Sequence, residues 1–231
     1  RYGAVLMAVA HSAASESHTG TTGSASQAAF TWTHTQTGTP QGVLIFVYTF
    51  NSTTALVQSV TYGSLGVSNI FVGQTDTAGE PGRIDMYYTG VANIPSGNQT
   101  ITVNRTNNTT VMYATAATVT ASYQTEAYVP GVITLQNDQA LVEQSVSDGY
   151  PGSFSLRYAG VYSGLQTPPS AGASSTLLNS IDIGNYGAAM VRETTAGQGP
   201  RNVGFSGASD DVAAFHVAIR EVNPRRIVLY T

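Results

Sequence analysis

The residues best suited to chemistry lie in the segment FTWTHT, where the chain's single Trp stands two positions before one of its four His. In a strand, Phe30, Trp32 and His34 share one face, and the intervening Thr share the other. One interpretation is a face that buries the two aromatic rings behind a threonine surface, because large aromatics are usually buried. The alternative is an exposed Trp platform for a sugar ring, with His34 as its hydrogen-bond partner. We favour burial for Trp32.

Other candidate residues do not form a catalytic pattern. His216 lies in AAFHVAIRE and reads as a partly exposed structural His rather than a catalytic base. A glycosidase needs two carboxylates that face each other across a cleft, and Asp85 on a strand with Glu80, Glu126 or Glu143 elsewhere could supply them. Distance along the sequence does not show whether any two of these carboxylates face each other.

Known catalytic signatures are also missing from the sequence. It contains no G-x-S-x-G elbow, no H-E-x-x-H, no P-loop and no dinucleotide fingerprint. It has no Cys, which excludes a disulfide framework, a thiolate nucleophile and a Cys-based metal site. We therefore predict a protein that is not an enzyme and uses no cofactor or metal.

The composition is poor in charge. Charged residues make up 10% of the 231 residues, against roughly 25% in an average soluble protein. All nine basic residues are Arg, the net charge is −4, and the longest basic run is Arg225-Arg226. Nucleic-acid binding needs a clustered positive footprint, so we expect no nucleic-acid partner. The longest apolar run, residues 2–10, falls short of the roughly 20 residues that span a bilayer. We expect no membrane partner, and a first strand at 2–10 rather than a signal peptide.

The dominant hydrophobic period is two, which indicates strands. The run VLIFVYTF (43–50) predicts a strand covered on both faces. RIDMYYTG (83–90) alternates, so that Tyr87 and Tyr88 point to opposite faces. The segments 99–104 and 111–123 flank an Asn pair and predict a hairpin, and 137–146 has room for one or two helical turns.

Many short strands separated by Gly, Pro and Asn turns predict an all-β fold. We expect a two-sheet antiparallel β-sandwich, jelly-roll-like and with little helix. We expect the sandwich to be a single domain over 1–223, followed by a C-terminal strand or tail over 224–231. In that tail Ile227, Leu229 and Tyr230 are candidate assembly contacts, because a short strand that is apolar on both faces seeks a partner sheet edge.

Several phrases in order carry a resemblance to known proteins: FTWTHT (30–35), VLIFVYTF (43–50), SVTYGSLGV (59–67), RIDMYYTGVANIPSGNQTITV (83–103) and YAGVYSGLQTPP (158–169). Together they resemble a diffuse group of β-sandwich proteins from the structural modules of tailed bacteriophages and from bacterial extracellular proteins. The resemblance covers roughly the first 170 residues and implies a virion or surface component without a catalytic site.

Two functions therefore compete. The first is a virion structural protein, a capsid decoration or a head- or tail-associated component, which is a homo-oligomer or binds other virion proteins. The second is a secreted carbohydrate-binding module or lectin, for which Trp32, His34, Tyr87 and Tyr88 are the candidate glycan or interface aromatics.

Overall fold

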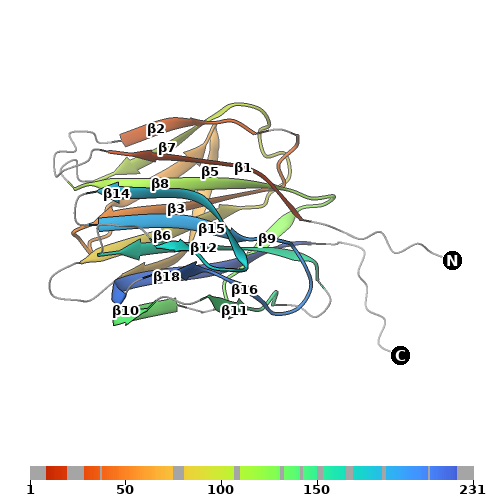
Figure 1. Cartoon of the computed structure of the whole chain (residues 1–231). Helices are drawn as coiled ribbons and strands as arrows, with labels where there is room; N and C mark the ends of the chain where they lie inside the picture. Colours follow the sequence, from red (N-terminus) through yellow and green to blue (C-terminus); the bar gives the residue numbers. More distant parts are fainter. Residues whose placement is uncertain are drawn as a thin grey trace.

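The alternating and β-branched segments of the sequence form strands throughout. The computed structural model describes residues 9–19, 29–36, 38–74, 81–106, 110–130, 133–140, 143–149, 153–164, 169–183, 186–207 and 209–222. Over these residues the chain is all-β and antiparallel, with no helix. The predicted β-sandwich is confirmed (Figure 1).

The first half of the chain builds an eight-stranded sheet in the order β1-β8-β3-β6-β5-β4-β7-β2. Its strands are β1 (Ala10–His18), β2 (Ala29–His34), β3 (Gly42–Phe50), β4 (Val57–Tyr62), β5 (Leu65–Gln74), β6 (Gly82–Thr89), β7 (Gln99–Arg105) and β8 (Met112–Thr120). This sheet folds over itself at β5. Residues 65–67 of β5 pair with β4, whereas residues 68–74 pair with β6.

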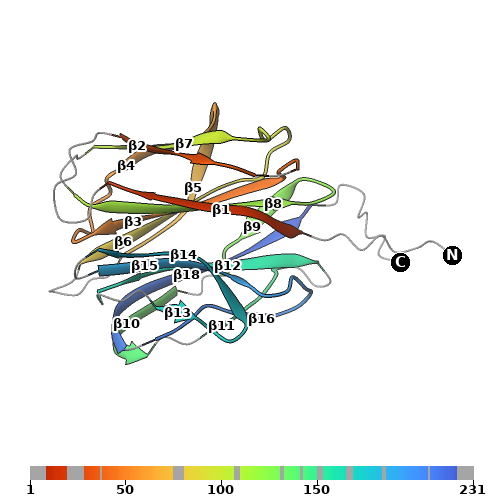
Figure 2. The ribbon, with the colours of Figure 1, turned by 45° about the horizontal axis from the view of Figure 1, so that its top comes forward.

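The fold at β5 divides the sheet into two packed layers, which Figure 2 shows one above the other. We call β2, β7, β4 and the start of β5 the outer layer, and β1, β8, β3, β6 and the rest of β5 the central layer. Apolar side chains of both fill the space between them, for example Val60 and Ile101 from the outer layer against Ile45 and Tyr87 from the central one.

The second half of the chain forms a six-stranded sheet on the other side of the central layer. Its path is β10-β18-β12-β15-β14, and β9 also pairs with β18. These strands are β9 (Thr125–Tyr128), β10 (Ile133–Ala140), β12 (Ser155–Ser163), β14 (Ser175–Ile183), β15 (Tyr186–Glu193) and β18 (Ser209–Glu221). Phe46, Tyr48 and Met86 of the central layer pack here against Tyr158 and Phe215. Every residue of β3 is buried, as the unbroken apolar run predicts.

Two small sheets cover the far face of the six-stranded sheet. One pairs β11 (Gln144–Val146) with β16 (Arg201–Val203), and the other pairs β13 (Ser170–Ala171) with β17 (Phe205–Ser206). Val146, Val203 and Phe205 pack on apolar residues of that sheet. This cover buries His216, which is 1% exposed, so the prediction of a partly exposed His216 is wrong.

Two local predictions are also wrong. The segments 99–104 and 111–123 do not form a hairpin, because β7 pairs with β2 and β4 while β8 pairs with β1 and β3. β7 belongs to the outer layer and β8 to the central layer. The helical turns expected over 137–146 are replaced by β10 and β11, since pairing with distant strands outweighs a weak local pattern.

The remaining predictions fall partly outside the described residues. The first strand begins at Ala10, and residues 1–8 lie outside the description, as does the segment 223–231 with Ile227, Leu229 and Tyr230.

Candidate functional site

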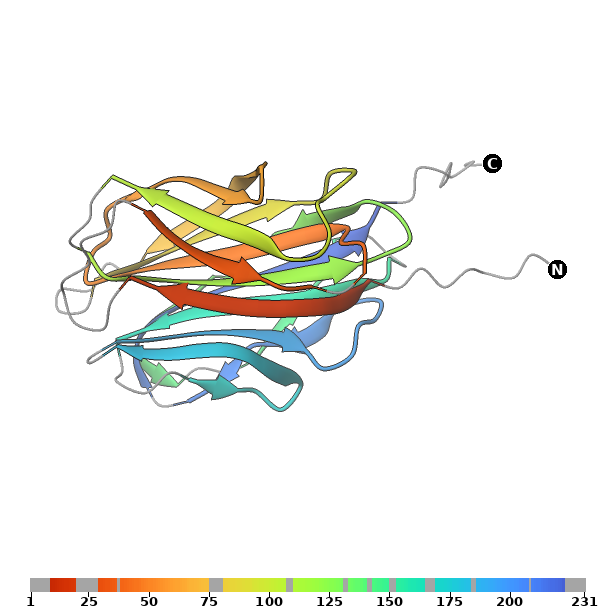
Figure 3. The same ribbon diagram turned by 90° about the horizontal axis from the view of Figure 1, so that it is seen from above.

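Trp32 and His34 lie where the outer and central layers meet along one side of the molecule. The edge strands β2 and β1 run side by side there (Figure 3). Trp32 is half-buried and stacks on Phe30 with ring centroids 6.0 Å apart. Its indole Nε1 donates to Ser15 Oγ of β1 over 2.8 Å. The ring thus contributes to the core, and its polar end ties the two strands together.

His34 continues this hydrogen-bonded chain into the interior. Its Nδ1 lies 2.7 Å from Ser15 Oγ, and its Nε2 lies 3.2 Å from Thr118 Oγ1 on β8. The side chain is fully buried, and burial lowers its pKa to about 4. The imidazole is therefore neutral at pH 7. With Ser15 donating to Nδ1 and Nε2–H donating to Thr118, both ring nitrogens are satisfied.

The Ser15–His34 contact has the distance of a nucleophile–base pair but not its chemistry. A general base works best when its pKa lies near the working pH, and His34 has a pKa far below that. The second ring nitrogen bonds a threonine hydroxyl, where a catalytic His is usually oriented by a carboxylate. We call Ser15, Trp32, His34 and Thr118 the seam cluster. Its geometry holds two layers together.

Tyr87 and Tyr88 follow each other on β6 and point to opposite faces of the central layer. Tyr87 packs between the outer and central layers, and Tyr88 packs toward the six-stranded sheet. The Tyr88 hydroxyl and Thr125 Oγ1 are 2.6 Å apart. The structure therefore brings Trp32 and His34 together, but it does not join them with Tyr87 and Tyr88 in one aromatic platform.

A buried charged network lies under the loop between β15 and β16, and the sequence gives no pattern that points to it. The Arg157 guanidinium is fully buried and donates to both oxygens of Glu193, at 3.0 and 3.2 Å. Arg201 Nε donates to Glu193 Oε2 over 3.0 Å. Burial raises the pKa of Glu193, and the two guanidinium groups oppose that rise. Arg157 also donates to the carbonyl of Val146, so the network fastens β12, β15 and the cover together.

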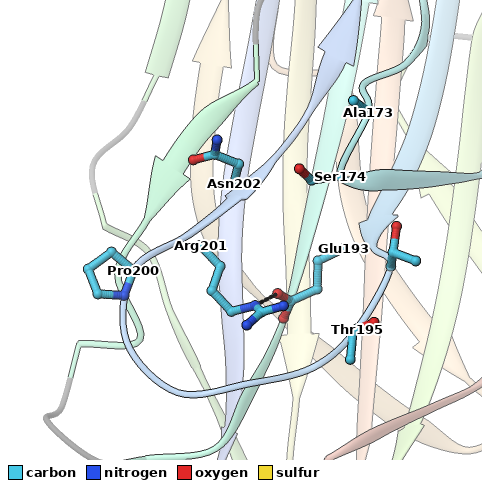
Figure 4. Close-up of a pocket in the computed structure, with 8 residues that line it drawn as sticks. Ala173, Ser174, Glu193, Thr195, Pro200, Arg201 and Asn202 are labelled. Atoms are coloured by element: carbon cyan, nitrogen blue, oxygen red, sulfur yellow. Dashed lines mark hydrogen bonds and ion pairs between the residues drawn. The ribbon is translucent and has the colours of Figure 1, made fainter.

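A shallow pocket of about 520 Å³ opens above this network (Figure 4). Glu193 lies at its floor, and Ser174, Thr195 and Asn202 contribute polar groups to its wall. Arg201 reaches from β16 toward Glu193 across the pocket (Figure 4). The Arg201 guanidinium is thus paired with the Glu193 carboxylate, which also accepts hydrogen bonds from Arg157.

The acidic candidates do not converge on a cleft. Asp85 is held by Arg83, Glu126 by Arg220, and Glu143 by the backbone N–H of Ser174 and the hydroxyl of Ser175; Glu80 lies outside the described residues. Within the described part of the chain, no group of three or more His, Asp or Glu side chains is arranged to hold a metal ion.

The outer layer presents a face of hydroxyl groups to solvent, as the alternation in FTWTHT predicts. Thr31 and Thr33 are exposed, and the register places them opposite Thr102 and Thr100 of β7. Thr102 in turn lies opposite Thr61 of β4. Next to this row, Asn104 donates to Ser59 Oγ over 2.9 Å. We call these seven residues the hydroxyl face. None of them is charged.

No family model, curated protein or solved structure matches the chain. A search of the described residues for a helix long and apolar enough to cross a bilayer also finds none.

Proposed function

We propose that this chain is a non-enzymatic structural protein that acts through protein–protein interfaces, as a decoration or a head- or tail-associated component of a virion. The hydroxyl face carries the proposal. It extends across β2, β7 and β4 and offers hydrogen-bond donors and acceptors without a charge.

Such a face suits repeated association between protein surfaces. Net charge keeps protein copies apart through repulsion, and an uncharged face provides little of it. Hydroxyl groups can also bind a partner through bridging waters, at a low cost in desolvation. Because only 10% of the residues in the whole chain are charged, electrostatic repulsion between copies is weak over the rest of the surface as well.

The seam cluster supports the non-enzymatic part of the proposal. The Ser15–His34 contact is used inside the fold, with a neutral imidazole that is hydrogen-bonded at both ring nitrogens. The buried network of Arg157, Glu193 and Arg201 likewise holds strands together.

Light scattering of the full chain over a wide concentration range tests the interface. We expect a mass above that of the monomer, and a Thr102→Lys variant should shift the protein toward monomer because it places a charge at the centre of the hydroxyl face. Thr194→Lys, on the exposed loop after β15, is the matched control and should keep the wild-type mass. A chain that is monomeric at high concentration and does not bind particles would contradict the proposal.

The particle itself provides a second test. Quantitative mass spectrometry of virions purified from a producing culture should detect the chain in many copies per particle. Its absence from such particles would remove the virion assignment, while the light-scattering result would still decide whether the chain self-assembles.

A further inference from the structure

A groove of about 550 Å³ lies where β5 leaves β4 to join β6. Because β5 changes partner after Val67, the two neighbouring strands diverge on either side of it. One wall is formed by residues 57–61 of β4, and the other by β5 and by the β6 residues 83–87. The groove is therefore a consequence of the fold that creates the two layers.

The β6 wall carries an ion pair with fixed geometry. Arg83 Nε donates to Asp85 Oδ2 and its Nη2 donates to Asp85 Oδ1, both over 2.8 Å. The side chains are only 12% and 4% exposed. The charges cancel, yet the carboxylate keeps free lone pairs and the guanidinium has further N–H groups. The Asp85 carboxylate thus offers a ligand a hydrogen-bond acceptor in a fixed position, and the Arg83 guanidinium offers a donor beside it.

Neutral groups surround the ion pair. Tyr87 and Asn69 both line the groove. Burial is the main reason why the pKa of Tyr87 rises to about 12, so its hydroxyl stays protonated at physiological pH. Ser59 and Ser68 add hydroxyl groups, and Val72, which is 39% exposed, adds an apolar patch.

We propose that this groove binds a neutral saccharide. A sugar presents adjacent hydroxyl groups, one of which can donate to Asp85 while the next accepts from Arg83. Its C–H face suits Val72, and the carboxamide of Asn69 can bond a further hydroxyl. The cancelled charge favours a neutral ligand over an acidic one. This site is separate from the seam cluster and goes beyond the proposed structural function.

The alternative occupant of such a groove is an extended peptide added to the edge of β4. The register of β4 argues against it, because a bulge between Val57 and Ser59 interrupts the ladder with β7 at this position. A bulge disturbs the regular spacing of backbone donors and acceptors that an added strand requires.

An array of neutral and acidic oligosaccharides, probed with the full chain, tests the proposal. The oligosaccharide retained best is then titrated while the backbone amides are followed by NMR. We expect retention of a neutral glycan, with shifts concentrated in β4, β5 and β6. Asn69→Ala should weaken its binding about tenfold, the loss of one hydrogen bond. Val72→Ser should weaken it as well, and Thr33→Ala on the hydroxyl face should not.

Both groove variants replace exposed side chains, so they leave the core intact, and their light-scattering mass should remain that of the wild type. Retention of no glycan, preference for acidic glycans, or equal affinity in Asn69→Ala would each overturn the proposal. So would binding of an extended peptide in the groove in place of sugar. None of these results changes the mass, so failure here is distinct from failure of the assembly proposal.

Discussion

Acidification should destabilise this protein through His34. The pKa of the buried imidazole lies at about 4, against 6.5 for a solvated His. Above pH 6.5 the imidazole is neutral in both the folded and the unfolded chain. Between pH 6.5 and 4 the unfolded chain binds a proton that the folded chain does not, so the free energy of unfolding falls with pH by about 1.4 kcal/mol per unit. The full loss approaches about 3 kcal/mol at pH 4.

Urea unfolding at pH 7 and pH 5 measures this effect before most carboxylates titrate. His34 alone should account for a loss of about 2 kcal/mol over that interval. His11 acts in the same direction, because burial, assisted by Arg192, lowers its pKa to about 4 as well. The His34→Gln variant should therefore retain only part of the wild-type pH dependence.

The control is His18→Gln, which replaces an exposed imidazole on β1. It should keep the wild-type difference between the two pH values. If His34→Gln and wild type lose equal stability from pH 7 to pH 5, the buried neutral imidazole is not the cause and the reasoning fails.

Three further predictions concern packing and are checked by the same unfolding assay. Trp32→Ala should cost about 2–3 kcal/mol, below the usual range for a fully buried aromatic, because the side chain is only partly buried. Gly160→Ala places a Cβ 2.8 Å from core aromatic atoms and should cost about 1–3 kcal/mol. Its control, Gly66→Ala, meets no atom within 4 Å and should change stability by less than about 0.5 kcal/mol. Arg157→Met should cost about 3–5 kcal/mol, because it leaves the buried Glu193 carboxylate with Arg201 as its remaining ion-pair partner, and adding Glu193→Leu should recover part of that loss.

Local patterns predicted the faces of individual strands well. The apolar run in β3 indicated burial on both sides, and the alternation in FTWTHT placed the threonines outside and Phe30 and His34 inside. Both results depend only on the period of two in a strand and on the side chains themselves.

Partners that are distant in sequence could not be predicted. His216 looked partly exposed because the strands that cover it come from residues 144–146 and 201–206. The Ser15 partner of Trp32 and His34 lies in β1, a strand of small and polar residues without an apolar signal. The groove depends on β5 changing layers, and no residue type in LGVSNIFVGQ marks that change.

The pairing order of the strands has a consequence for how the chain reaches its native state. Ala10 pairs with Thr120, and Thr125 pairs with Glu221. Each of the two large sheets is therefore complete only when its last strand in sequence, β8 or β18, is available. Domains dominated by such non-local pairs fold in milliseconds to seconds rather than microseconds, because the chain loses loop-closure entropy before the stabilising contacts form. During synthesis β1 stays unpaired until about a hundred further residues, which include its partner β8, have left the ribosome. β1 has few apolar side chains, so a strand of Ser, Ala and His gives other chains little hydrophobic surface for aggregation while it is unpaired.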